Sequence, residues 1–248
     1  MIINKKELEQ LRKNAKVHKM VFDEIKNIVK PGVSAYEIDK LCEKICEQNG
    51  VLPGFKGVYG FPANICISIN NVVVHGVPKK DMIFMEGDVV KFDFGVKDKN
   101  IAINTDAAFT MIVGDGPKNP EIEKFLEINK QALYKGIEQC RVGNRVGDIG
   151  NAIQKHVEGN GFYIVRDLTG HGIGYKLHEK PYIYNYGKPG TGEKLKEGML
   201  LAIEPIVGFS SGKIKDKGGW EIYIADGSLG CQFEHTILVT SGDPEIII

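Results

Sequence analysis

Apolar and polar positions at the start of the chain alternate with the period of an α-helix. Over residues 7–29, apolar or small side chains recur every three or four positions, which predicts a helix with one buried face. Ser34, with Glu37 three residues later, has the sequence of a capping box and predicts that a second helix starts there. Its apolar positions continue to Ile45, and Gly50 predicts its end.

The same pattern recurs at an offset of 111 residues. The segment 31–50 falls on 142–161, and the segment 85–93 falls on 196–204, with matching glycines and apolar positions. One offset that relates separated segments indicates two similar halves, residues 5–110 and 116–240 approximately, within a single domain over residues 1–248. Arg145 stands where the first half has Ser34, so we do not expect the capping box to be repeated.

Strand-like segments follow each pair of predicted helices. Helices followed by runs of strands favour an α+β fold over a doubly wound sheet, and no Pro/Ser-rich linker separates the halves. The segments expected to form strands are 65–69, 72–75, 89–96, 101–113, 162–166, 199–207, 221–225 and 233–240.

Composition excludes several classes of protein. Lys+Arg and Asp+Glu both number 32 in 248 residues, so neither nucleic acid nor an acidic membrane is favoured as a partner. No apolar run reaches the ~20 residues of a membrane span, and the charged start of the chain lacks the apolar core of a signal peptide. The 5 cysteines include no CxxC pair, which is typical of reduced thiols in a cytoplasmic protein.

Four acidic residues are embedded in the apolar strand segments: Asp93, Asp106, Glu204 and Glu234. The offset aligns Asp93 of the first half with Glu204 of the second half. A single such acid often caps a strand or lies at an edge, but four buried carboxylates require cations, and Lys and Arg are scarce in these strands. Four carboxylates with one imidazole balance two divalent ions and suit Mn, Fe, Co or Zn. Two such ions that share a water indicate metal-assisted hydrolysis.

The histidines fall into two groups. His18 and His156 lie on predicted helices and His235 follows Glu234 on the opposite strand face, so all three are interpreted as surface or packing residues. Three others lie at strand ends or in loops, where catalytic groups are commonly held: His75, His171 and His178. The glycines of GHGIG, residues 170–174, are expected to form a compact turn, because the motif lacks the Lys-Ser/Thr of a phosphate loop and residue 175 is Tyr.

These segments together resemble the bacterial-type, type I methionine aminopeptidases. The motifs are CISINNVVVHGVP, EGDVVKFDFGV, NTDAAFT, GHGIGYKLHE, EGMLLAIEP, GGW and FEHTILVT, in order along essentially the whole chain. The resemblance implies the pita-bread fold, in which two pseudo-twofold halves place a central antiparallel sheet under helices. It also implies removal of the initiator methionine from nascent proteins, with a preference for a small second residue.

The resemblance assigns roles at the centre of the fold. Asp93 and Asp106 would bind one of two divalent ions, His171 and Glu204 would bind the other, and Asp106 and Glu234 would be shared. Glu204 would also help to activate the water. His178 would hold the scissile carbonyl oxygen and its oxyanion, and His75 would contact the nitrogen of the scissile amide.

The resemblance also implies an apolar pocket for the methionine side chain, whose thioether gains from aromatic contacts. Its members would be Val58, Phe61, Cys66, Leu177 and Trp220. Val58 and Leu177 stand where this family often has Tyr and Phe, which would reshape the pocket. The INTD sequence before the second ligand also departs from the usual lead-in and changes the hydrogen bonding expected there.

We expect a monomer that acts on nascent polypeptide N-termini, with transient ribosome association. One alternative is an Xaa-Pro peptidase, which shares the fold and metal site but usually has an extra N-terminal domain, whereas Leu8 already belongs to the first helix here. The other is a non-enzymatic binding protein on the same fold. Such relatives lose ligands and gain basic segments, whereas this chain is neutral and keeps every ligand position.

Overall fold

Within the described part of the chain, four long helices form two pairs. The computed structural model describes residues 2–117 and 119–248. The helices are α1 (Lys5–Ile28), α2 (Ala35–Gln48), α3 (Pro120–Ile137) and α4 (Val146–Gly159). The predicted capping box of α2 is confirmed, because the Ser34 N–H donates to the Glu37 carboxylate at 2.8 Å and the Glu37 N–H donates to Ser34 Oγ at 3.3 Å. At α4 half of the box persists, contrary to expectation: the Arg145 N–H donates to Asp148 Oδ2 at 2.8 Å.

The strands pair antiparallel throughout the described chain. They group into the sets β1-β4-β2 with β5 on β4, β13-β10-β6, β11-β12-β3, and β15-β14-β9-β7-β8. Their bounds are β1 (Leu52–Pro53), β2 (Cys66–Ile69), β3 (Val72–Val74), β4 (Val89–Lys97), β5 (Asn104–Ile112), β6 (Tyr163–Ile164), β7 (Thr169–Gly172), β8 (Glu179–Tyr184), β9 (Leu200–Ile203), β10 (Ile206–Gly208), β11 (Ile214–Asp216), β12 (Ile222–Ile224), β13 (Gly230–Gln232), β14 (His235–Leu238) and β15 (Glu245–Ile246).

Each predicted strand segment contains a strand, but two segments differ in a way that matters for the site. The segment 199–207 is two strands, β9 and β10, interrupted at Glu204 and Pro205, because proline has no N–H for the ladder. The segment 233–240 contributes only β14, so Glu234 lies just before a strand rather than within it. Both glutamates therefore sit at strand breaks.

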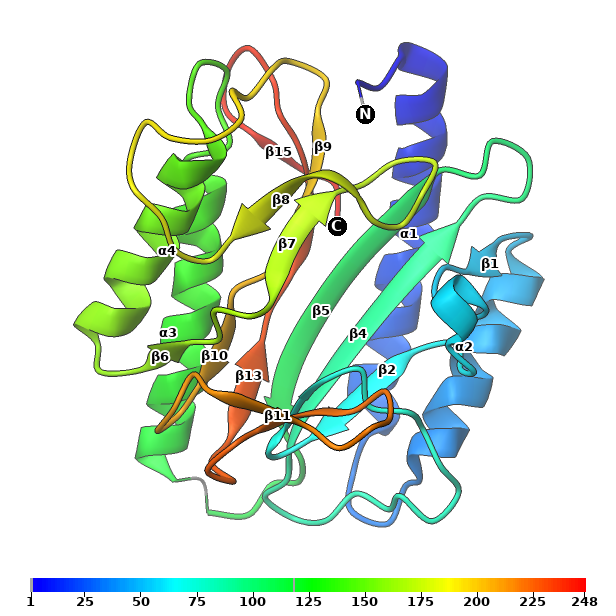
Figure 1. The fold of residues 1–248 in the computed structure, drawn as a ribbon. Coiled ribbons are helices and arrows are strands. Elements are labelled where there is room, and N and C mark those ends of the chain that lie inside the picture. Colours follow the sequence, from blue (N-terminus) through cyan, green and yellow to red (C-terminus); the bar gives the residue numbers. More distant parts are fainter. Residues whose placement is uncertain (1, 118) are drawn as a thin grey trace.

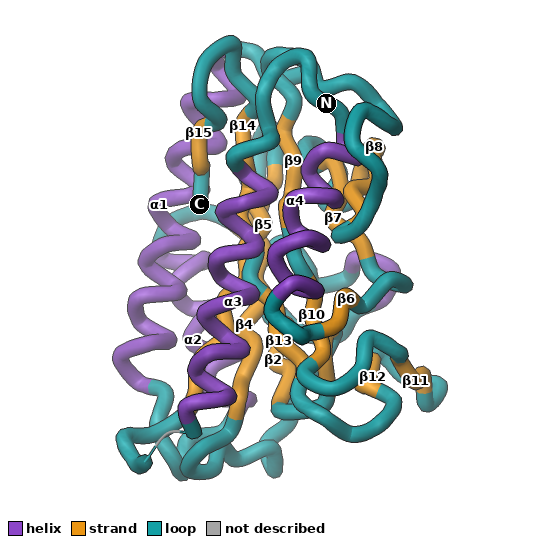
Figure 2. The backbone as a smooth tube through the Cα atoms, turned by 90° about the vertical axis from the view of Figure 1, so that its left-hand side faces the viewer, coloured by secondary structure: helices purple, strands orange, loops and turns teal. Residues whose placement is uncertain are grey.

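The two halves follow the offset found in the sequence. When the offset of 111 is added, the bounds of α2 become the bounds of α4. The bounds of β4 likewise become the first residue of β9 and the last residue of β10. One apolar cluster packs α1 and α2 on β4 and β5, through Val21, Ile38, Phe92 and others, and a second packs α3 and α4 on β9 and β10. The helix pairs flank the strands on the two sides of Figure 1. In Figure 2 the pair formed by β11 and β12 projects on the side away from α1 and α2.

A seam of hydrogen bonds joins the halves at the middle of the molecule. Ala108 of β5 and Glu234 exchange backbone hydrogen bonds of 3.2 and 2.9 Å. The Asp106 N–H donates to Thr236 Oγ1 at 2.8 Å, and that hydroxyl donates back to the Asp106 carbonyl at 2.7 Å. The seam fixes β5 of the first half against β14 of the second. Among the described residues, no helix is long and apolar enough to cross a membrane.

Candidate metal centre

The strand register brings three acidic side chains to one face. Asp93 is paired with Ala108, and Gly95 is paired with Asp106, so Asp93 and Asp106 are diagonal neighbours across β4 and β5. Ala108 is also bridged to Glu234 across the seam. Directly opposed residues of paired strands project to the same side. Asp93, Asp106 and Glu234 therefore converge, and their carboxylate oxygens lie within 4.8 Å of one another.

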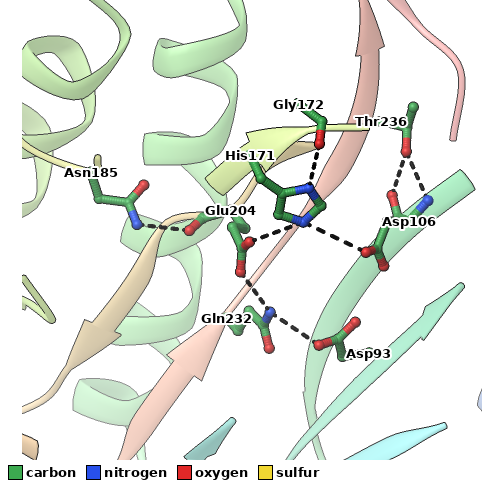
Figure 3. A network of polar contacts seen from close by, with 8 residues as sticks. All are labelled: Asp93, Asp106, His171, Gly172, Asn185, Glu204, Gln232 and Thr236. Atoms are coloured by element: carbon green, nitrogen blue, oxygen red, sulfur yellow. Dashed lines mark hydrogen bonds and ion pairs between the residues drawn. The ribbon is translucent and has the colours of Figure 1, made fainter. Parts of the chain in front are cut away.

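The second half supplies Glu204 and His171 to the same centre. Ala202 of β9 is paired with His171 of β7, and Glu204 follows two residues after Ala202, on the same face. His171 Nε2 lies 3.6 Å from Glu204 Oε1 and 3.8 Å from Asp106 Oδ2, as Figure 3 shows. The structure thus brings all five expected ligands together, from both halves.

The glycines next to His171 do not form the compact turn that the sequence predicts. Residues 169–172 are the strand β7 rather than a turn. A Cβ added to Gly170 would lie 2.4 Å from the Ala202 carbonyl oxygen, and one added to Gly172 would lie 2.2 Å from that of Lys180. Only glycine permits these approaches. The glycines therefore let β7 fit closely between its neighbours and carry His171 into the centre.

The tautomer of His171 suits a metal ligand. Its Nδ1 lies 2.9 Å from the Gly172 carbonyl oxygen, which can only accept, so Nδ1 carries the proton. The lone pair of Nε2 then points at the carboxylates. Burial, followed by the nearby His178, lowers the pKa of His171 to about 3, so the imidazole is neutral at physiological pH.

Burial makes the charge of the carboxylates unfavourable. It raises the pKa of Asp93 to about 7, and it raises the pKa values of Asp106, Glu204 and Glu234 well above their ordinary range, with further increases from their mutual repulsion. The one buried lysine of β4, Lys91, donates its Nζ to the Asn70 carbonyl at 2.7 Å. Asp93 Oδ1, Asp106 Oδ1 and Glu234 Oε1 are buried without hydrogen-bond partners among the described residues. These oxygens and the neutral imidazole fit a divalent metal.

Gln232, at the end of β13, is a site residue that the sequence pattern does not reveal. Its Nε2 lies 3.4 Å from Asp93 Oδ2 and 3.3 Å from Glu204 Oε2, so it donates to a carboxylate from each half (Figure 3). The only signal in the sequence is its position two residues before Glu234, which places both on one face of an extended segment.

The two remaining candidate histidines lie beside the carboxylate cluster. The rings of His178 and His171 meet edge to face with centroids 4.5 Å apart, and Tyr59 stacks on His178 at 5.7 Å. Burial lowers the pKa values of both His75 and His178, and His178 lowers that of His75 further. Neutral imidazoles can each donate one hydrogen bond to a bound carbonyl or amide.

A cavity of about 380 Å³ opens beside the cluster. The Phe61 and Trp220 rings form one apolar part of its wall, edge to face with centroids 5.2 Å apart. Trp220 reaches the cavity from the loop between β11 and β12. The lining includes every residue expected for the ligand set, the catalytic pair and the methionine pocket: Val58, Phe61, Cys66, His75, Asp93, Asp106, His171, Leu177, His178, Glu204, Trp220 and Glu234.

The other histidines lie away from the cavity, as expected. His18 is buried between Phe22 and Phe94, His235 lies beside Tyr134, and His156 is on α4. These side chains contribute to packing. The INTD segment acts through Asn104, whose Nδ2 donates to the Gly174 and Tyr175 carbonyls at 2.8 and 3.2 Å and so holds the loop between His171 and His178.

Buried carboxylates and a neutral imidazole in the lining of a largely apolar cavity define a metal-dependent hydrolase. The family model of metallopeptidase family M24 matches residues 9–241. The chain belongs to this family, whose pita-bread fold and divalent-metal site it shares.

A methionine aminopeptidase from Clostridium perfringens is 42% identical over 245 residues, covering 98% of this chain and 96% of the relative. Methionine aminopeptidase 1 from Bacillus subtilis is 38% identical over 250 residues, covering 100% and 99%. The crystal structure of a methionine aminopeptidase from Thermotoga maritima has a TM-score of 0.95 and 38% identity, covering 100% of this chain and 98% of that one.

Proposed function

We propose that this protein hydrolyses the peptide bond after an N-terminal methionine, most readily when the second residue is small. The observation that supports this most directly is the position of the metal-ligand cluster at one end of an apolar cavity lined by Phe61, Cys66 and Trp220. The similarity to relatives named methionine aminopeptidase over nearly the full length of the chain points the same way.

Two divalent ions, drawn from Mn, Fe, Co and Zn, fit the donor set. Asp93 and Asp106 would hold one, His171 and Glu204 would hold the other, and Asp106 and Glu234 would contribute to both. Bound ions would supply the lowered water pKa and the charge stabilisation that hydrolysis needs. Gln232 keeps one oxygen each of Asp93 and Glu204 oriented while the others remain available.

The chain's own residues perform the remaining steps. Glu204, with its carboxylate 3.6 Å from His171, accepts and returns the proton of the attacking water. His178 donates to the carbonyl oxygen of the scissile bond and retains that hydrogen bond as negative charge develops. His75, which also lines the cavity, contacts the amide nitrogen.

The shape of the cavity determines which first residue of the substrate is accepted. A methionine side chain would place its thioether against Phe61 and Trp220, whose perpendicular rings present a face and an edge. Val58 is half-buried and Leu177 is buried, so the pocket is aliphatic at both positions. We infer that the protein works as a monomer in the cytoplasm on nascent polypeptide N-termini, with transient ribosome association.

The decisive test is methionine release from Met-Ala-Ser by protein stripped of metal and then supplied separately with Mn, Fe, Co or Zn. We expect release with at least one metal and none without metal. Release of the first residue from an Xaa-Pro peptide but not from Met-Ala-Ser would favour the Xaa-Pro peptidase. A protein that binds no metal and is not stabilised by metal would favour the non-enzymatic alternative.

A further inference from the structure

Strand β8 exposes a row of aromatic side chains close to the metal centre. Tyr182 and Tyr184 are 58% and 46% exposed, although the intervening Ile183 is buried. Tyrosine side chains are enriched where proteins bind other chains, because a large rigid ring offers contact area at little entropic cost. We call Tyr182 and Tyr184 the tyrosine face.

Register places the tyrosine face on the same side of the sheet as the metal ligands. Tyr182 is paired directly with His171, and Tyr184 is paired with Thr169, which also lines the catalytic cavity. Directly opposed residues project to the same side. The row therefore starts one strand away from His171 and continues along β8. Figure 1 shows β8 beside β7.

A second hollow is lined by both residues of the tyrosine face. Its volume is about 520 Å³, and Tyr182 lines both spaces. Its lining also includes Tyr186, whose ring centroid lies 5.4 Å from that of Tyr184. The Arg166 guanidinium lies over the Tyr186 ring, 4.7 Å from its centroid. The hollow thus has three tyrosines in its lining and adjoins the catalytic cavity at Tyr182.

We propose that the tyrosine face binds the polypeptide substrate downstream of its second residue. This inference rests on the proposed function, which places the scissile bond beside His171. Tyr184 is about 5 Å across the sheet and about 7 Å along it from that point. An extended chain advances ~3.3–3.6 Å per residue, so the fourth and fifth residues of the substrate reach Tyr184. Ring faces favour apolar and aromatic side chains at those positions.

The test compares kcat/KM for Met-Ala-Ser-Leu-Phe and Met-Ala-Ser-Gly-Gly, using the full chain loaded with its active metal. The wild type should favour the first peptide by about threefold to tenfold, the range of one or two aromatic contacts. Tyr184→Ser should bring this ratio close to one. Tyr163→Ser, which removes a tyrosine of β6 that is 48% exposed and lines neither space, should keep the wild-type ratio.

The outcomes separate the two hypotheses. A wild-type ratio of one, or a ratio that Tyr184→Ser does not change, overturns the tyrosine face while leaving methionine removal intact. Loss of the ratio in Tyr163→Ser as well would overturn it too, because the preference would not depend on β8. Failure to release methionine from either peptide overturns the proposed function, and the tyrosine face with it.

Discussion

His18 links the stability of the protein to pH. It lies on α1 and is fully buried, with Nδ1 3.2 Å from Thr105 Oγ1 and its ring against Phe22 and Phe94. Its Nε2 has no hydrogen-bond partner among the described residues. Burial, and to a lesser extent the charge of His235, lowers the pKa of His18 from 6.5 to about 3. A protonated imidazole therefore does not fit the folded state.

The protein becomes less stable as the pH falls, because the unfolded chain binds a proton at His18 more readily than the folded chain does. Below pH 6.5 the unfolded chain protonates His18, whereas the folded chain does so only near pH 3. The contribution of neutral His18 to stability is complete above pH 6.5 and is lost as the pH falls through 3. Each pH unit in that window removes about 1.4 kcal/mol from the free energy of unfolding, so a fall to pH 5 costs about 2 kcal/mol.

The measurement is urea unfolding of the wild type and His18→Leu at pH 7.5 and pH 5.0, both without metal. Groups other than His18, including His235 and the buried carboxylates, titrate in both proteins and cancel in the difference. The free energy of unfolding of His18→Leu relative to the wild type should rise by about 2 kcal/mol at the lower pH. His18→Gln, which also cannot take a proton, should show the same rise. A difference that stays constant with pH refutes the reasoning.

Three further predictions concern the site. His178→Ala should lower kcat by about 10²-fold without reducing bound metal, as measured by metal analysis and Met-Ala-Ser turnover, and unchanged kcat would reject its role at the oxyanion. Phe61→Ala, at a side chain 5% exposed, should raise KM for methionine peptides and lower the free energy of unfolding by about 3–5 kcal/mol, and an unchanged KM would place the methionine pocket elsewhere. Mn²⁺ at 100 times its Kd should stabilise the metal-free protein by about 2.7 kcal/mol, and Asp106→Asn should lose most of this gain; equal gains in both proteins would exclude Asp106 as a ligand.

Local chemistry in the sequence determined the helices and much of the site's composition. The periodicity of residues 7–29 and the capping box at Ser34 specify helices without reference to the rest of the chain. Acids surrounded by apolar residues reveal buried carboxylates that require cations, since burial of a lone charge is costly. These inferences depend on neighbours within a few positions, which is the information that a single sequence carries.

Strand pairing determined the parts of the fold and of the site that local sequence patterns do not reveal. Strands β7 and β8 lie outside the predicted segments, because Gly170, Gly172 and Pro181 weaken the local strand signal. In the structure, β7 nevertheless pairs with β9, and β8 pairs with β7. The role of Gln232 depends on its contacts with Asp93 and Glu204, which its position two residues before Glu234 does not reveal.

The sequence by itself thus determined which groups could carry metal chemistry and that two similar halves supply them. Only the tertiary structure decided that Asp93, Asp106 and Glu234 share a face with His171 and Glu204, and that Tyr182 stands next to His171. The physical reason is register: a shift of one residue in a strand turns every side chain to the other face. Contacts between distant strands across the central seam, rather than any local preference, fix that register.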